Sequence, residues 1–472
     1  MIEFKNEIEI LNTLSKIDII IFSAIIFLTI FSVFYGQSLQ KKDNEKEGFL
    51  DLLIMGRTLT LPMFVATLVA TWYGGIFGVT EIAFKDGIYN FITQGLFWYI
   101  AYIIFALFLT NKISPYKALT MPDLIGKMFG QKSAKLSAIF NFFNVLPIAY
   151  TISLGIFLQV LFGGELVWNM LLGVSFVILY SMWGGLRAVV FSDLIQFLVM
   201  CISVFLVLYL SVSTFGGLDY LKDTLPQKHF SPTGRHGLAE TLAWGFIALS
   251  TLVDPNFYQR CFAAKDQKVA KKGILISTFV WFLFDICTTF GAMYARSVIP
   301  EAESSGAYLT YTIQLLPEGL KGFFLAGILA TILSTLDSYL FLAGTNLAYD
   351  LAPKKYKGKM MIHHIGVVFV GLLSVVMAIV FEGNIKSVWK TLGSYSASCL
   401  LLPVIFGYIF PRKIKDIHFV IICTTGVIFT TIWRMLDRQG IWAEIDSLYI
   451  GVITTTFATI LTLIFDAKRL KN

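Results

Sequence analysis

Long apolar runs separated by short polar loops dominate this chain of 472 residues. A run of about 20 apolar residues can cross a bilayer as a helix, and about thirteen such runs recur from one end of the chain to the other. The loops between them are too short for a separate soluble domain. The pattern predicts an all-helical, polytopic membrane protein with spans near 17–36, 58–84, 88–110, 133–162, 165–183, 189–213, 241–262, 273–296, 320–349, 361–381, 388–410, 416–434 and 446–465.

The composition supports this class, because 56% of the residues are hydrophobic and only 14% are charged, which excludes an ordinary soluble enzyme. The net charge of +7 does not indicate nucleic acid, because with thirteen spans the basic clusters all fall on one side of the membrane. Positive residues favour the cytoplasmic side. We therefore predict a cytoplasmic (inner) membrane protein with its N-terminus outside and its C-terminus inside. The basic clusters are at 41–42, 112–127, 265–272, 354–359, 412–415 and 468–471.

Two predicted spans contain breaks at mid-membrane. Ala70 to Gly78 includes Gly74 and Gly75, which weaken a helix, and Ser250 to Asn256 includes Pro255, which interrupts one. The breaks lie about five spans apart, an odd offset that gives the two segments opposite orientations, as in inverted repeats. Unwound backbone in a membrane is tolerated only where it lines a cavity. The pair therefore favours a transport site over two packing kinks.

The run 323–348 is apolar except for an acid, Asp337, and a set of hydroxyls. A carboxylate at that depth is usually functional. The hydroxyls share one helical stripe and, with carbonyls freed near 69–73, would suit Na⁺ better than Mg²⁺. The alternative is that these side chains bond back to their own helix. The stripe consists of Thr331, Ser334, Thr335 and Ser338.

A second polar group runs from Gly184 to Gln196, where a glycine turn precedes a span that carries Asp193 in its first turns. A carboxylate at this position favours a helix start through capping and the helix dipole. The functional alternative is a second cation or proton site that faces Asp337 and Ser338. Two further intramembrane acids, Glu81 and Asp285, have no assigned role.

Three motifs resemble the sodium/solute symporter family. The first is Gly184-Gly185-Leu186 with Ala188-Val189, Asp193 and Gln196. The second is Ser334-Thr335-Leu336-Asp337-Ser338 with Asp350, and the third is Asp254-Pro255 with Gln259-Arg260. The resemblance spans nearly the whole chain and implies a LeuT-like fold of two inverted five-helix repeats, with one helix before them and two after. The implied units are 1–57 (first helix and cytoplasmic loop), 58–213 (first repeat), 214–240 (external loop), 241–410 (second repeat) and 411–472 (two last helices).

The resemblance also implies an ion site and, in some members, a second one. Hydroxyls of Ser334 and Thr335 would bind the principal sodium, with the backbone carbonyls of Val69, Trp72 and Thr331. In the two-sodium pattern, a further ion would lie among Asp193, Ser334, Asp337 and Ser338. Because some relatives have serine where this chain has Asp337, that second site could bind Na⁺, bind a proton or form a salt bridge with an arginine.

The implied solute site lies in the broken part of the first core helix and on its neighbours. Ala70-Thr71-Trp72 followed by Gly74-Gly75 is similar to the family's choline carriers, whose aromatic box suits a quaternary ammonium. Asp254 stands where those carriers have tryptophan, and it could bind a protonated amine or cap a helix. The candidate solute residues are Thr71, Trp72, Tyr73, Gly74, Gln94, Asn141, Asn144 and Asp254.

We therefore expect a sodium-coupled secondary active symporter that imports a small organic solute (an amine, amino acid, sugar or carboxylate) by alternating access. It would use Na⁺, lie in the lipid bilayer, bind no nucleic acid and function as a monomer. A proton-coupled carrier of the same fold is the nearest alternative, and a transporter-like sensor or channel is another. An enzyme is disfavoured, because no nucleophile–base or metal-ligand spacing occurs.

Overall fold

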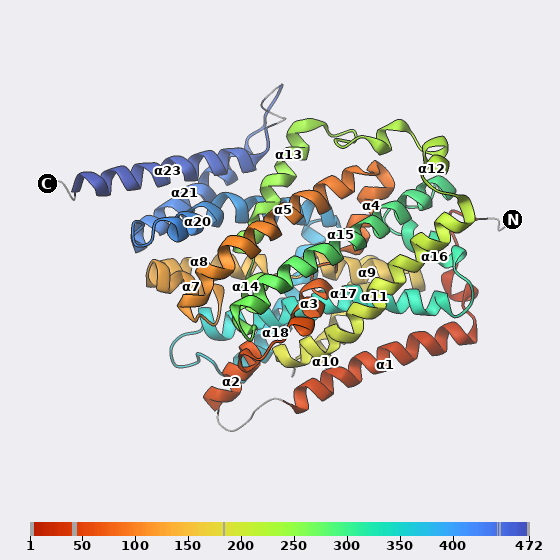
Figure 1. Ribbon diagram of the computed structural model, residues 1–472, viewed down its shortest axis with the longest axis horizontal. Helices are drawn as coiled ribbons and strands as arrows, with labels where there is room; N and C mark the ends of the chain where they lie inside the picture. The colour runs from red at the N-terminus through yellow and green to blue at the C-terminus, as the bar shows by residue number, and fades with distance from the viewer. Residues whose placement is uncertain (1–3, 40–44, 183–184, 441, 443–444, 470–472) are drawn as a thin grey trace.

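The computed structural model describes residues 4–39, 45–182, 185–440, 442 and 445–469, and within these the chain is built from helices, apart from one isolated bridge between Leu59 and Ala264. The longest helices lie side by side along one direction, and the described chain starts and ends at opposite ends of this bundle (Figure 1). In the first half the α-helices are α1 (Lys16–Ser38), α2 (Glu45–Ile54), α3 (Leu61–Ala70), α4 (Ile76–Asp86), α5 (Phe97–Ile104), α6 (Thr110–Ile113), α7 (Met121–Met128), α8 (Gln131–Asn144), α9 (Ile148–Phe162), α10 (Leu166–Ser181) and α11 (Leu186–Phe215).

The second half likewise contains short helices between long ones. Its α-helices are α12 (Leu218–Thr224), α13 (Gly237–Ala248), α14 (Pro255–Ala263), α15 (Gln267–Val298), α16 (Ala307–Leu315), α17 (Leu320–Thr345), α18 (Met360–Val380), α19 (Ile385–Ser396), α20 (Leu402–Ile409), α21 (Asp416–Met435) and α23 (Ser447–Arg469). Several long helices include π-helical turns, which are at Phe91–Leu96, Phe105–Leu109, Asn346–Leu351 and Ala397–Leu401.

Ten helices in the described ranges are long and apolar enough to cross a membrane. This confirms the multi-pass, all-helical prediction, although the count of thirteen spans is not confirmed as such. The three remaining predicted spans coincide with α10, which is shorter, and with the two interrupted segments α3–α4 and α13–α14. The unwound part divides each interrupted segment into two helices, and neither helix is long enough to cross a membrane by itself.

Both predicted breaks are present. The first core helix stops at Ala70 and resumes at Ile76, so residues 71–75, which include the two glycines, are not α-helical. In the second, α13 passes into a 3-10 turn at Leu249–Val253, and α14 begins at Pro255 with the Asp254 carboxylate as its N-cap. Proline is favoured in the first turn of a helix, where its missing N–H has no partner to lose.

A third interruption, between α8 and α9, was not predicted, because 133–162 reads as one apolar span. Residues 145–147 separate the two helices, and Pro147 immediately precedes α9. Asn144 therefore ends one helix beside the interior of the protein rather than continuing along a regular span. This break brings a polar side chain to the central cavity described below.

Helix α17 lies at the centre of the bundle, and the most apolar stretch of this span is buried along its whole length. Close packing against it depends on small residues, because a Cβ at Gly327 would lie 2.0 Å from Ser203 Oγ on α11. The first helix, α1, is attached to the start of α17 through Asp18, whose Oδ1 accepts from the backbone N–H groups of Gly319 and Gly322, both at 2.8 Å. The polar stripe of α17 is thus placed in the protein interior, where its hydroxyls need internal partners.

The loop 214–240, predicted to be external, contains the short helix α12 and a 3-10 turn at Gln227–Phe230. It is anchored to the end of α4, because Ile88 N–H donates to the His229 carbonyl at 2.8 Å and Arg235 Nε donates to Asp86 Oδ1 at 2.7 Å. Burial lowers the pKa of His229, so its ring stays neutral where it meets the Phe84 carbonyl. These contacts attach the loop to the end of α4.

Candidate functional site

The hydroxyls of Ser334 and Thr335 face the point where α3 ends. Ser334 Oγ donates to the Ala70 carbonyl at 2.8 Å, and Thr335 Oγ1 lies 3.3 Å from the same carbonyl oxygen. Thr335 Oγ1 also accepts from the Gly74 N–H at 2.9 Å. All four residues are buried. Two hydroxyls and freed backbone carbonyls thus converge at the first break, and these hard oxygen donors are the ligand type that Na⁺ prefers.

Of the predicted backbone ligands, Thr331 meets the same two hydroxyls, whereas the Val69 carbonyl has other partners. The Thr331 carbonyl accepts from both Ser334 and Thr335 at 3.2 Å, and the Val69 carbonyl accepts from the Trp72 N–H and from Trp281 Nε1. The Ala70 carbonyl, which meets both hydroxyls, was not in the predicted set. Sequence spacing alone does not fix which carbonyl of a broken helix turns toward a neighbour.

A second polar cluster joins α3, α11, α14 and α17. Asp193 Oδ2 accepts from Thr67 Oγ1 at 2.5 Å, while its Oδ1 has no hydrogen-bond partner. Asp337 Oδ2 lies 3.4 Å from Tyr180 Oη, and its Oδ1 is also unpartnered. A basic residue donates to Ser338 and to Thr67, and so connects α17 with the partner of Asp193.

That residue is Arg260 on α14, which is fully buried. Its guanidinium donates to Ser338 Oγ at 3.0 Å and to Thr67 Oγ1 at 3.3 Å, and it also donates to Asn256 Oδ1. Thr67 therefore bridges Arg260 and Asp193. Arg260 is part of the third motif but was not among the predicted site residues. Its spacing from Asp254 does not show where its side chain points.

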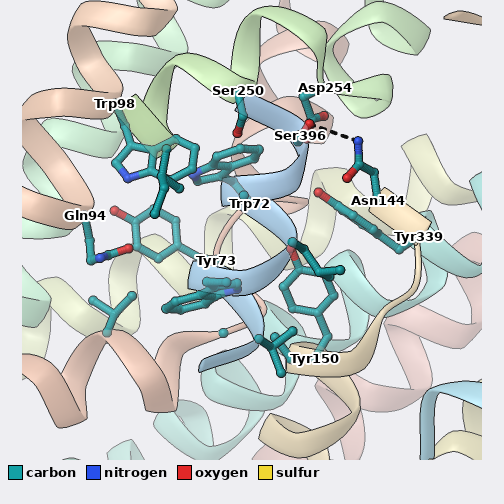
Figure 2. A pocket seen from close by; sticks show the side chains of 18 of the residues that line it. Trp72, Tyr73, Gln94, Trp98, Asn144, Tyr150, Ser250, Asp254, Tyr339 and Ser396 are labelled. Atoms are coloured by element: carbon teal, nitrogen blue, oxygen red, sulfur yellow. Dashed lines mark hydrogen bonds between the residues drawn. The ribbon is translucent and has the colours of Figure 1, made fainter. Parts of the chain in front are cut away.

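A cavity of about 130 Å³ lies between the two broken segments and α19, beside the hydroxyl stripe. Figure 2 shows aromatic rings of Trp72, Trp98 and Tyr73 on one side and those of Tyr150 and Tyr339 on another. Asn144 Nδ2 donates to Ser396 Oγ at 3.1 Å across the wall of the cavity. The residues that line it are Trp72, Tyr73, Gly75, Val79, Gln94, Trp98, Asn144, Leu146, Ala149, Tyr150, Ile247, Ser250, Asp254, Asp285, Tyr339, Val388, Trp389, Leu392, Gly393 and Ser396.

Trp72 is the centre of the aromatic wall. Its ring packs edge-on against Trp98, Tyr102 and Phe257, with centroid distances of 5.3, 5.7 and 5.4 Å. Trp72 remains partly accessible from the cavity, whereas Tyr102 and Phe257 are buried behind it. The inner rings hold the outer indole in one orientation, which presents a fixed π-surface to a ligand.

Five of the predicted solute residues line this cavity, namely Trp72, Tyr73, Gln94, Asn144 and Asp254. Three others do not. Thr71 is fully buried and bonds back to the Thr67 carbonyl at 2.7 Å, Gly74 lies against Thr335, and Asn141 lies one helical turn before Asn144 outside the lining.

Asp285 on α15 also lines the cavity and had no predicted role. Its two carboxylate oxygens accept hydrogen bonds from Tyr73 Oη and Tyr99 Oη. Only 2% of the residue is exposed. The sequence offered one signal for Asp285, namely an acid within an apolar span. Such residues are rare in membranes unless they serve a site.

The two broken helices, the central hydroxyl-bearing helix and the cavity between them define a helical membrane protein of the LeuT-like class. Within that class, the chain belongs to the sodium:solute symporter family, whose model matches residues 53–416. It is 27% identical over 246 residues to a sodium/pantothenate symporter of Haemophilus influenzae, covering 50% of this chain and 51% of the relative. It is 26% identical over 271 residues to a sodium/glucose cotransporter of Vibrio parahaemolyticus, covering 49% and 50%. The chain thus spans about half the length of these relatives.

Solved structures agree on the fold. A Na⁺-coupled sialic acid symporter in a substrate-bound, outward-open state superposes with a TM-score of 0.76 at 16% identity, covering 96% of this chain and 98% of the other. MhsT in complex with L-phenylalanine gives a TM-score of 0.53 at 11% identity, covering 85% and 98%. The predicted family and fold class are therefore confirmed.

Proposed function

We propose that this protein is a sodium-coupled secondary active symporter that imports a small organic solute across the cytoplasmic membrane by alternating access. The observation that carries the proposal is the meeting of Ser334 and Thr335 with the Ala70 carbonyl at the first break. These groups come from α17 and α3, two separate elements. An ion bound between them would fix the position of one element relative to the other.

The same geometry supports coupling to the solute. The unwound residues 71–75 have the α17 hydroxyls on one side, through Gly74, and the cavity on the other, through Trp72, Tyr73 and Gly75. A sodium ion that orders this segment also orders one wall of the cavity. A ligand can shift a conformational equilibrium only by its differential affinity for the two states, and ordering of the break supplies that difference.

The membrane potential adds to the driving force. One positive charge that moves inward gains about 2.3 kcal/mol for every ~100 mV of potential. We further propose that the N-terminus is external, the C-terminus is cytoplasmic, and the monomer suffices for transport.

Binding of radioactive Na⁺ to the purified protein tests the sodium site without knowledge of the solute. We expect saturable binding of Na⁺ and no comparable binding of K⁺. Ser334→Ala should weaken the Na⁺ binding. A sodium gradient across proteoliposomes should then drive uptake of any solute that raises Na⁺ affinity. Equal Na⁺ binding by wild type and Ser334→Ala would contradict the proposed site.

We also propose a second ion position in the cluster of Asp193, Asp337 and Arg260. Two carboxylates and one guanidinium leave one negative charge uncompensated when both acids are ionised. The unpartnered Oδ1 atoms of both acids support binding of one further cation. A proton on this carboxylate pair is the specific alternative, and proton uptake measured with a pH indicator during Na⁺ binding separates the two.

A further inference from the structure

The charges around the solute cavity are unbalanced. Asp254 and Asp285 both line it, and none of the described lining residues is Lys, Arg or His. Charged groups within a membrane protein are retained where they pair with an opposite charge or meet a substrate. The wall therefore carries two acidic side chains, and no described lining residue supplies a positive charge to pair with them.

The partners of the two acids do not cancel this charge. Asp285 accepts from the hydroxyls of Tyr73 and Tyr99, which are neutral donors. Asp254 Oδ1 accepts from the backbone N–H groups of Asn256 and Phe257 at 2.8 and 3.3 Å, which are neutral as well. These bonds fix the orientation of both carboxylates but provide no positive charge.

The nearest buried cation is directed elsewhere. Arg260 lies on the same helix as Asp254, but its guanidinium donates to Ser338, Thr67 and Asn256, outside the cavity lining. Lys390, next to the lining residue Trp389, pairs with Asp446 at 3.2 Å. In the described part of the chain, neither side chain forms an ion pair or hydrogen bond with Asp254 or Asp285.

The remaining wall suits the same kind of ligand. Trp72, Trp98 and Trp389 are partly accessible from the cavity, and aromatic faces attract cations, tryptophan most strongly. Tyr150 and Tyr339 add rings on the opposite side (Figure 2). An anionic solute would meet two carboxylates without a counter-charge, and such like-charge contacts oppose binding strongly.

We infer that the solute is an organic cation, an ammonium group on a small apolar or hydroxylated body. The inference rests on the proposed function and names the substrate class of its solute site. Asp254 and Asp285 would supply the counter-charge, and the tryptophans would contact the body and the charged head. A primary amine would use the N–H donors that carboxylates accept, whereas a quaternary ammonium would rely on the rings.

Two sets of size-matched probes test the charge. Choline is compared with its uncharged carbon isostere neohexyl alcohol and with the tert-butylacetate anion, and butylamine is compared with butanol and butyrate. We expect a Na⁺-dependent rise in the melting temperature of the purified full-length protein with choline, butylamine or both. A response to butylamine alone indicates recognition through N–H donors, and one to choline alone indicates recognition by the rings. An equal or larger response to the alcohols or anions overturns the inference, as does the absence of a response to both cations.

Two isosteric variants locate the charge. Asp254→Asn keeps a good helix cap, and Asp285→Asn keeps an oxygen acceptor for one tyrosine. A hydrogen bond to a charged group contributes enough that each change should weaken binding of the responding cation by about tenfold or more. Asp18→Asn, at a fully buried acid on α1, is the control and should bind the cation as wild type does. Unchanged cation binding in both cavity variants would overturn the inference.

Sodium alone provides the separate readout for the proposed function. If Na⁺ stabilises the protein and Ser334→Ala removes this effect while the cations do nothing, the substrate class is wrong and the symport proposal stands. If the cations bind equally with and without Na⁺, the substrate class stands and the sodium coupling is wrong. Retained Na⁺ stabilisation in the Asp254 and Asp285 variants also shows that they are folded.

Discussion

The contacts of two hydroxyl groups distinguish the proposed ion site from ordinary helix packing. Ser334 and Thr335 each bond back to Thr331 within α17, as the bland interpretation of the stripe requires, yet both also reach the Ala70 carbonyl on another helix. A hydroxyl that only bonds back to its own helix would not need this contact with the Ala70 carbonyl. The two interpretations thus differ in a measurable way, by whether removal of a hydroxyl changes ion affinity or only stability.

We predict that Ser334→Ala and Thr335→Ala each lower the apparent affinity for Na⁺ by about tenfold, which corresponds to the loss of one well-placed ligand. Thr80→Ala is a matched control, because Thr80 is a buried hydroxyl that bonds back to Ile76 within α4. Saturation binding of radioactive Na⁺ provides the measurement. An effect of Thr80→Ala as large as that of Ser334→Ala would indicate general loosening of the fold.

The carboxylates beside Arg260 give a second prediction. Asp337→Asn removes one of two acids around a single guanidinium, so the cluster becomes neutral without an added ion. We expect the number of cations bound per protein, counted as Na⁺ plus protons, to fall by one. Calorimetric titration with Na⁺ in two buffers of different protonation enthalpy measures both quantities. An unchanged count would show that Arg260 already balances the cluster.

Helices and their breaks were largely predictable from the sequence, because glycine and proline act on the backbone locally. Gly74-Gly75 and Pro255 interrupt α-helices where expected. The break before α9 was missed, because the apolar pattern continues through Pro147. The positions of Arg260 and Asp285 could not be predicted either, because the rotation of each helix about its axis depends on packing against several others at once.

The first break presents adjacent glycines to different neighbours. A Cβ at Gly74 would lie 2.5 Å from Thr335 Cβ, and one at Gly75 would lie 2.0 Å from Trp389 Cζ2. We predict that Gly74→Ala chiefly weakens Na⁺ binding and Gly75→Ala chiefly weakens solute binding, each by about tenfold, the effect of overpacking by roughly 1–3 kcal/mol. Gly217→Ala, with open space around the new Cβ, should bind both as wild type does. The same loss of both ligands in each variant would refute this division.

At the scale of the whole molecule, the family and fold were predictable because their motifs are spread along the chain, whereas the membrane orientation remains a prediction from the charge pattern. The described chain begins and ends at opposite ends of the bundle (Figure 1), in keeping with an odd number of crossings. The five cysteines are partly or fully buried. Single exposed cysteines can therefore report sidedness with little background.

We predict that Asp219→Cys, in the loop 214–240, reacts with a membrane-impermeant maleimide on intact cells. Lys355→Cys, in the basic loop between α17 and α18, should react only after the cells are permeabilised. Both positions are exposed. The reverse pattern would invert the topology and place the C-terminus outside.

The tryptophans of the cavity wall have an optical consequence. Trp72, Trp98 and Trp389 line one small space and are three of the nine tryptophans of the chain, so part of its intrinsic fluorescence arises there. Displacement of water or quenching by a bound solute would alter the emission without any attached dye. Binding of unlabelled compounds to the cavity can therefore be screened by the tryptophan fluorescence of the protein.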